Sequence, residues 1–182
     1  GETQTSYLAR FNFLSRQDIT LLRKAYTLAE IGHKNQVRDS GEPYFTHPRT
    51  VSLLLLKIGV KDVHIHVAVL CHDLIEDTVM TIEQIRDHFG DKVMKIVKTV
   101  SIPSKSNGSF VAQDEYELYF EQLKNGSPEA QLVAIGDNLH NIQTLRYSSY
   151  EKQQRIRMRA ETYYIPAISV VSKTIPEAKK LK

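Results

Sequence analysis

The residues best suited to chemistry lie in the segment CHDLIEDT, residues 71–78, which holds one imidazole and three carboxylates. If this segment is helical, residues four apart share one face. His72 is then expected beside Glu76. For the same reason Asp73 is expected beside Asp77. An imidazole next to carboxylates is a donor set for a divalent cation such as manganese, iron or zinc.

The flanking residues separate a metal site from an ordinary acidic surface. Acidic clusters on helices are more often solvated faces. Here the apolar segment VAVLC precedes His72 and Asp73, and Leu-Ile separates this pair from Glu76 and Asp77. A solvated face would not need apolar residues on both sides of each pair. Four such side chains buried without partners would cost on the order of several kcal/mol. We therefore favour a cation that compensates their charge.

One helix cannot surround a cation, so further ligands must come from elsewhere in the chain. His47 stands before Pro48, at the expected mouth of a helix, because proline is favoured at the first helical position. Asp137 interrupts the apolar stretch VAIGDNLHN. The proposed ligand set is His47, His72, Asp73 and Asp137. Two imidazoles and two carboxylates leave positions open for water or a phosphate oxygen, which is typical of a catalytic metal.

The elements that must position these residues are predicted to be helices. Apolar residues recur at spacings of three and four from end to end, and alternating runs typical of strands are hard to find. We expect an all-α, single-domain bundle with its core at about 18–173. The first predicted helix is capped by Asp18 and ends near Gly32. The others cover 49–57, about 62–77, 81–89, 91–100, 113–124, 128–146 and 149–173, with Pro166 interrupting the last. Residues 101–109, SIPSKSNGS, are predicted to form a loop.

Composition limits the classes of function. The 182 residues are 41% hydrophobic and 25% charged, as in an ordinary globular domain. A formal charge of +3 suits small anionic ligands and does not support a nucleic-acid groove. The single cysteine excludes an internal disulfide and a zinc-thiolate cluster. Without an apolar run of about 18 residues we expect no membrane span and a cytoplasmic protein. Oligomeric state does not follow from the sequence.

Three segments in the same order carry a resemblance to a known family. RDSGEPYFTHP, HDLIEDT and GDNLHNIQTL resemble the hydrolase domain of the RelA/SpoT homologues, a branch of the HD-domain metal-dependent phosphohydrolases. The likeness runs from about Ala25 to Ile165. It implies an all-helical bundle of the HD type, a manganese ion, and removal of pyrophosphate from the 3′ position of guanosine tetra- or pentaphosphate, the alarmones of the stringent response. Because no segment is long enough for the synthetase domain of larger members, residues 1–182 are expected to be one stand-alone hydrolase domain.

The resemblance also assigns roles to residues. It makes His47, His72, Asp73 and Asp137 the metal ligands, which agrees with the set reasoned from the residues. Glu76 and Asp77 match the catalytic carboxylates. We expect Glu76 to transfer the proton and Asp77 to position either the water or a neighbouring group that supports the site. The positions that match substrate contacts are Arg38, which would stack on the base, Asn141, Thr144 and Arg146.

Two departures from the family pattern concern the base. Asp39 stands where the family usually has lysine, and Ala134-Ile135-Gly136 precedes Asp137 where larger enzymes have Lys-Leu-Ala. The adenine alarmones, (p)ppApp, therefore stay open beside (p)ppGpp. Two alternatives also stay open: a phosphatase of another ribose-phosphorylated nucleotide such as NADPH, and an alarmone-binding module without turnover. Among the remaining residues, Tyr44 is interpreted as structural, His64 and His66 as exposed, and His140 as either packed or lining the pocket.

Overall fold

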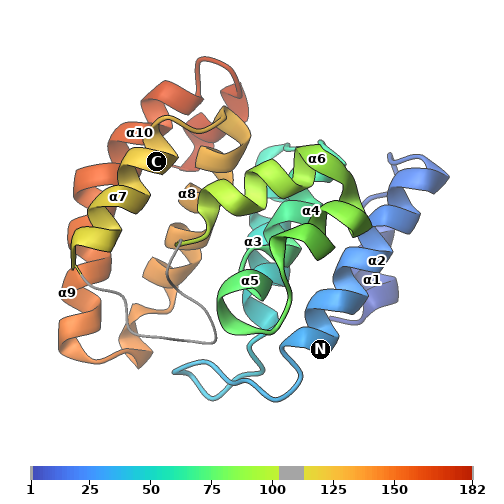
Figure 1. Ribbon diagram of the computed structural model, residues 1–182, viewed down its shortest axis with the longest axis horizontal. Helices are drawn as coiled ribbons and strands as arrows, with labels where there is room; N and C mark the ends of the chain where they lie inside the picture. The colour runs from blue at the N-terminus through green and yellow to red at the C-terminus, as the bar shows by residue number, and fades with distance from the viewer. Residues whose placement is uncertain (1, 103–112, 182) are drawn as a thin grey trace.

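The fold is a bundle of helices, as predicted (Figure 1). The computed structural model describes residues 2–102 and 113–181, so most of the predicted loop at 101–109 lies outside the described residues. In the described residues the only β-type pairing is one isolated bridge between Val37 and Pro43. The helices are α1 (Gln4–Ala9), α2 (Arg16–Gly32), α3 (Thr46–Ile58), α4 (Val63–Cys71), α5 (Leu74–Asp77), α6 (Ile82–Val100), α7 (Gln113–Lys124), α8 (Pro128–Gln143), α9 (Tyr150–Arg159) and α10 (Ile165–Val171), with the short helices η1 (Leu145–Tyr147), η2 (Ala160–Tyr164) and η3 (Pro176–Leu181).

Helix α4 forms the centre of the core. It packs against α2, α3, α6 and α8, and every residue of VHIHVAVLC except His64 is buried. A helix that is apolar on all sides is expected only where other helices surround it. Helix α8 lies between this group and a second group made by α7, α9 and α10 (Figure 1). The predicted metal ligands therefore belong to the central helices.

The prediction that His66 is exposed is wrong, because its side chain is fully buried. Its Nε2–H donates to the Val60 carbonyl at 2.9 Å, and its Nδ1 accepts from the Ser52 hydroxyl at 2.9 Å. Tyr7 and Ser52 share a further hydrogen bond of 2.6 Å. Burial lowers the pKa of His66 to about 4, so the ring is neutral. A histidine with both nitrogens bonded can be buried at little cost.

The predicted helix through residues 62–77 is interrupted at His72 and Asp73, between α4 and α5. His72 Nδ1–H donates to the Val69 carbonyl at 2.6 Å. A continuous helix would place the N–H of Asp73 on that same carbonyl. The ring of His72 thus competes with the helix, and the two proposed ligands lie in the turn that results.

Two helix starts differ from the predicted ones. Ser15, rather than Asp18, caps α2, since its hydroxyl accepts from the N–H of Asp18. Helix α3 begins at Thr46, so Pro48 lies inside its first turn. Proline is tolerated there because the first N–H groups of a helix have no partner within it. His47 is therefore part of the helix it was expected to precede.

The long predicted helix at 149–173 is broken before Pro166. Helix α9 ends at Arg159, residues Ala160–Tyr164 form a π-helical turn, and α10 begins at Ile165. Proline has no N–H to donate to Thr162, four residues earlier, so the ladder of α-helical bonds cannot pass through this point. The wider π-turn accommodates the missing bond.

Both ends of the described chain are ordered into short helices. Helix α1 was not predicted, although Thr3 and Ser6 form a reciprocal capping box at its start. At the other end η3 buries Ala178 and Leu181, and the Lys180 ammonium donates to the Ile58 carbonyl at 2.8 Å. None of the helices in the described part of the chain is long and apolar enough to cross a membrane.

Candidate metal centre and active site

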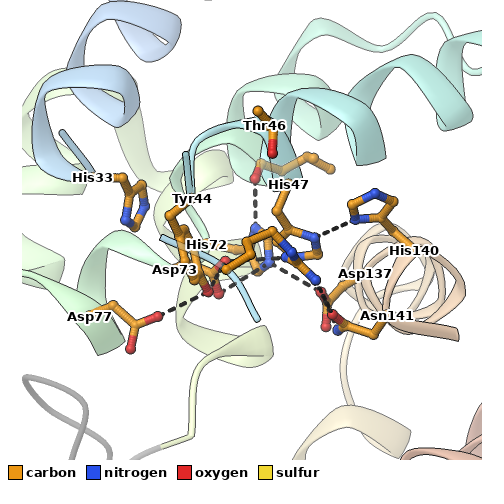
Figure 2. Close-up of polar contacts among 12 residues, drawn as sticks. His33, Tyr44, Thr46, His47, His72, Asp73, Asp77, Asp137, His140 and Asn141 are labelled. Atoms are coloured by element: carbon orange, nitrogen blue, oxygen red, sulfur yellow. Dashed lines mark hydrogen bonds and ion pairs between the residues drawn. The ribbon is translucent and has the colours of Figure 1, made fainter. Parts of the chain in front are cut away.

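The structure brings the four predicted ligands together from three parts of the fold (Figure 2). His47 comes from the first turn of α3, His72 and Asp73 from the turn between α4 and α5, and Asp137 from α8. His47 Nε2 lies 2.7 Å from Asp137 Oδ1 and 3.8 Å from Asp73 Oδ2. His72 Nε2 lies 3.3 Å from Asp73 Oδ1 and 3.7 Å from Asp137 Oδ1. Donor atoms of His47, His72 and Asp73 all lie within 4.8 Å of one another.

The chemistry of His72 fits a cation at this point. Because its Nδ1–H is donated to a carbonyl, a neutral ring presents the lone pair of Nε2 toward the carboxylates. Nε2 is buried and has no hydrogen-bond partner within the described residues. A ring nitrogen oriented by a backbone carbonyl, with its other nitrogen left for a metal, is the usual arrangement of metal-ligating histidines.

The electrostatics of the cluster favour positive charge. Burial alone would lower the pKa of His72, but the carboxylates of Asp73 and Asp137 outweigh burial and raise it to about 10. Burial alone would raise the pKa of Asp137, but His47 and His72 outweigh it and hold that pKa far below its usual range. The pKa of Asp73 is lowered in the same way, mainly by His72 and then His47. The buried carboxylate of Asp73 and the half-buried carboxylate of Asp137 thus attract a positive charge, as a proton or as a metal ion.

His140 supports the cluster from behind. Its Nδ1 lies 2.6 Å from Nδ1 of His47, and the two rings stack with centroids 4.9 Å apart. Burial first, and then the charges of His47 and Arg38, lower the pKa of His140 to about 4. The two Nδ1 atoms share one hydrogen bond, in which one ring donates and the other accepts. A neutral His140 can therefore fix which nitrogen of His47 carries the proton. Of the two interpretations open for His140, the structure supports the packed one: the side chain is buried against His47 and is not among the described residues that line the cavity.

The two acidic residues after the ligands have different surroundings. Glu76 is 7% exposed, borders the cavity of the site, and accepts from the N–H of Ile102 at 2.7 Å. Asp77 accepts from the Tyr44 hydroxyl at 3.1 Å, and the Gln36 amide donates to the Asp77 carbonyl at 2.6 Å. Asp77 does not border the cavity as far as the described residues define it.

Tyr44 has a more specific place than the structural role predicted for it. Its hydroxyl lies 3.0 Å from Asp73 Oδ2 and 3.1 Å from Asp77 Oδ2, so it bridges a candidate ligand and a candidate catalytic acid (Figure 2). Burial raises the pKa of Tyr44 well above its ordinary value, and the neighbouring carboxylates raise it further. The hydroxyl therefore stays protonated and can donate. The sequence feature that pointed to Tyr44 was its position three residues before His47.

Three of the four predicted substrate residues lie together. Arg38 donates to the Asn141 side-chain oxygen at 3.0 Å and to the Thr144 hydroxyl at 3.3 Å. Asn141 in turn donates to Asp137 Oδ1 at 3.0 Å. Arg146 lies apart from them, is exposed and bonds the hydroxyl of Tyr147. Among the described residues that line the cavity, Asn141 is the one member of these four.

The ligand cluster opens into a cavity of about 280 Å³. The wall provided by α9 is basic, with Lys152, Arg155 and Arg159 among the lining residues. Aromatic residues from α7 and η2 complete the lining, namely Tyr116, Tyr119, Phe120 and Tyr164. Sequence reasoning missed the basic wall. Its signal was present, because spacings of three and four in EKQQRIRMR place three cations on one helical face.

Comparison with known proteins agrees with the fold and the motifs. The model of the HD domain family matches residues 25–166. The chain is 32% identical over 145 residues to a guanosine-3′,5′-bis(diphosphate) 3′-pyrophosphohydrolase of Aquifex aeolicus, covering 80% of this chain and 20% of that protein. It is 31% identical over 156 residues to the bifunctional (p)ppGpp synthase/hydrolase SpoT of Escherichia coli K12, covering 85% and 22%. The chain spans about a fifth of the length of these curated relatives.

Two solved structures resemble the fold over nearly their whole length. One is described as a metazoan ortholog of SpoT that hydrolyses ppGpp. It has a TM-score of 0.70 and 22% identity, covering 85% of this chain and 94% of that one. The other is the lmo0812 protein of Listeria monocytogenes, with a TM-score of 0.55 and 26% identity, covering 78% and 98%. At these identities the likeness concerns the fold. Because the family model matches most of the chain, the chain belongs to the HD-domain proteins, with relatives among the RelA/SpoT hydrolases.

Proposed function

We propose that the chain is a metal-dependent phosphohydrolase that removes pyrophosphate from the 3′ position of a purine alarmone, (p)ppGpp or (p)ppApp. One observation carries the proposal: four candidate metal ligands and Glu76 border the same cavity as Arg155 and Arg159. The metal end of such a cavity suits a reacting phosphate, and its basic wall suits a second anionic group of the same molecule. The likeness to the 3′-pyrophosphohydrolase of Aquifex aeolicus supports this choice of reaction.

His47, His72, Asp73 and Asp137 would hold the cation. Nitrogen and carboxylate donors without thiolate suit manganese, which we propose as the metal, better than a soft ion. Bound there, a divalent cation supplies Lewis acidity toward water and toward a phosphoryl oxygen. The buried, unpartnered Nε2 of His72 supports a site of this kind.

The chain's own residues have separable tasks in this reaction. Glu76 takes a proton from the attacking water, whose oxygen bonds to the phosphorus next to the 3′ oxygen. The bond between that phosphorus and the 3′ oxygen breaks, pyrophosphate leaves with the oxygen of the water, and the 3′ oxygen takes up a proton from solvent. Asp77, which accepts from the same Tyr44 hydroxyl that bonds Asp73, orients groups at the site.

The remaining polar residues would recognise the nucleotide. Arg155 and Arg159 would meet phosphate charge at the basic wall. The guanidinium of Arg159 lies 3.6 Å from the centroid of the Tyr116 ring, which holds it flat against the aromatic face. Arg38 would stack on the purine, supported by its bonds to Asn141 and Thr144.

A substrate panel tests the proposal. Purified protein is incubated with ppGpp, ppApp or NADPH, in manganese, magnesium, zinc or a chelator. We expect manganese-dependent release of pyrophosphate and the 5′-diphosphate nucleoside from one or both alarmones. Glu76→Gln should lose most of that turnover and still bind nucleotide. Release of phosphate from NADPH alone would support the other phosphatase, and tight binding without any product would support a binding module; either result contradicts the proposal.

A further inference from the structure

An ion pair joins the loop before α3 to the start of α9. Asp39 Oδ2 accepts from the Lys152 ammonium at 2.8 Å and from the Ser148 hydroxyl at 2.7 Å. More than a hundred residues separate the partners in the sequence. The hydrogen bond from Lys152, followed by that from Ser148, lowers the pKa of Asp39. Asp39 therefore carries its charge at neutral pH.

This pair changes the basic wall of the cavity. Lys152 borders the cavity together with Arg155 and Arg159, whereas its partner Asp39 is not among the described residues that line it. Arg159 faces the Tyr116 ring instead of a carboxylate in the contacts of the described residues. Among the ion pairs of the described residues, Lys152 is the one of these three cations that pairs with a carboxylate of the protein. A phosphate at this end of the cavity must compete with Asp39 for Lys152.

The pair is suited to competition rather than to stability. The two side chains are 44% and 46% exposed, and exposed ion pairs contribute little to folding. A phosphate group carries more charge than one carboxylate and offers several acceptor oxygens. It can therefore displace Asp39, but the free energy needed to break the pair of Asp39 and Lys152 offsets part of the binding free energy of the phosphate. The adjacent Arg38 keeps its own bonds to α8 and does not depend on Lys152.

We propose that Asp39 lowers the affinity of the site for its nucleotide: its carboxylate engages the Lys152 ammonium and so weakens binding of the nucleotide phosphate that lies remote from the metal. The inference rests on the proposed function, since it assumes a nucleotide with a second phosphate group. It predicts that the chain binds such a phosphate less tightly than its three cavity cations would allow.

A double-mutant cycle tests this inference. Asp39→Asn should lower KM for the alarmone by about two- to five-fold with kcat unchanged, the range expected from an exposed pair. Lys152→Ala in the wild-type background should change KM by less than about two-fold, because Lys152 is already engaged. In the Asp39→Asn background the same change should cancel the gain. Calorimetric titration with GDP and ADP, which carry no 3′ phosphate to hydrolyse, should show the same pattern in Kd.

A matched pair elsewhere controls for surface charge. Lys92 and Asp62 are 2.7 Å apart and similarly exposed, and neither borders the cavity. Lys92→Ala should leave KM and Kd unchanged. If Asp39→Asn leaves Kd for GDP and ADP unchanged or raises it, or if the gain survives Lys152→Ala, the inference about Asp39 is wrong. If the wild type hydrolyses neither alarmone, the proposed function fails, and the titrations with GDP and ADP still decide the role of Asp39.

Discussion

At the scale of single residues, the side chains of the candidate metal ligands are oriented by hydrogen bonds with their neighbours. Val69 fixes the ring of His72, His140 contacts the ring of His47, and Tyr44 holds an oxygen of Asp73. Such supporting partners orient ligands and tune their basicity. The arrangement of the ligands therefore depends on residues that would not touch the cation.

The Tyr44 hydroxyl provides a direct test of this dependence. Tyr44→Phe removes the bond to Asp73 and Asp77 and keeps the ring, which stacks on His33 with centroids 4.8 Å apart. We expect about ten-fold weaker manganese binding and a similar fall in kcat, with KM little changed. Calorimetry and steady-state kinetics measure the two effects. Tyr150→Phe, at a residue that is 72% exposed, should change neither. Equal manganese affinity in Tyr44→Phe and the wild type would refute the supporting role.

Residue types and spacing predicted much of the candidate centre but not its supporting contacts. His72, Asp73 and Asp137 are polar residues within apolar stretches, and His47 stands before Pro48 at an expected helix start, so each of the four has a local signal in the sequence. The bond between His47 and His140 joins residues 93 positions apart, and no local pattern signals it. The ion pair of Asp39 and Lys152 was missed for the same reason, because its two partners lie in different elements.

At the scale of elements, periodicity predicted which segments are helical and erred at their ends. Helix ends depend on single hydrogen bonds, such as the Ser15 cap of α2 and the ring of His72 at the end of α4. Helix α1 has only six residues, so its apolar residues are too few to show a helical spacing. The break at Gly90 was predicted, and it separates two helical halves of α6.

Gly90 gives a prediction about this break. Its φ of 83° and ψ of 175° are nearly exclusive to glycine, and a Cβ there would have nothing within 4 Å. Gly90→Ala should therefore lower the free energy of unfolding by about 1–3 kcal/mol through backbone strain alone. Urea unfolding measures it. Lys95→Ala, at an exposed helical site in the same element, should have an effect below about 0.5 kcal/mol. Turnover should be unchanged in both, and an unaltered stability of Gly90→Ala would contradict the strain.

The buried histidine of α4 makes stability depend on pH. The pKa of His66 is about 4 in the folded chain and 6.5 as its ordinary value, so the unfolded chain binds the proton more readily. Stability from this group is fully present above pH 6.5 and is lost as the pH falls toward 4. The loss should reach about 3 kcal/mol. His140 shifts in the same direction. Urea unfolding of the wild type and His66→Asn across this range isolates the share of His66, and parallel pH profiles would refute it.

At the scale of the whole molecule, the candidate centre joins the helices of the core. Its proposed ligands come from α3, from the turn after α4, and from α8, and α8 also contacts α7, α9 and α10 (Figure 1). A cation bound by these residues would link segments that separate when the chain unfolds. Binding to the folded state alone shifts the unfolding equilibrium by mass action.

Metal binding should therefore be visible in the stability of the entire chain. At a free manganese concentration about 100 times the dissociation constant, the gain is about 2.7 kcal/mol, and the melting temperature should rise by roughly 5–10 °C over that in chelator. Asp137→Asn should lose most of this rise, because it removes one of the two carboxylate charges near the imidazoles of His47 and His72. Lys92→Ala should keep it. Since melting requires no substrate, an equal rise in Asp137→Asn and the wild type would exclude Asp137 as a ligand even if the enzyme were active.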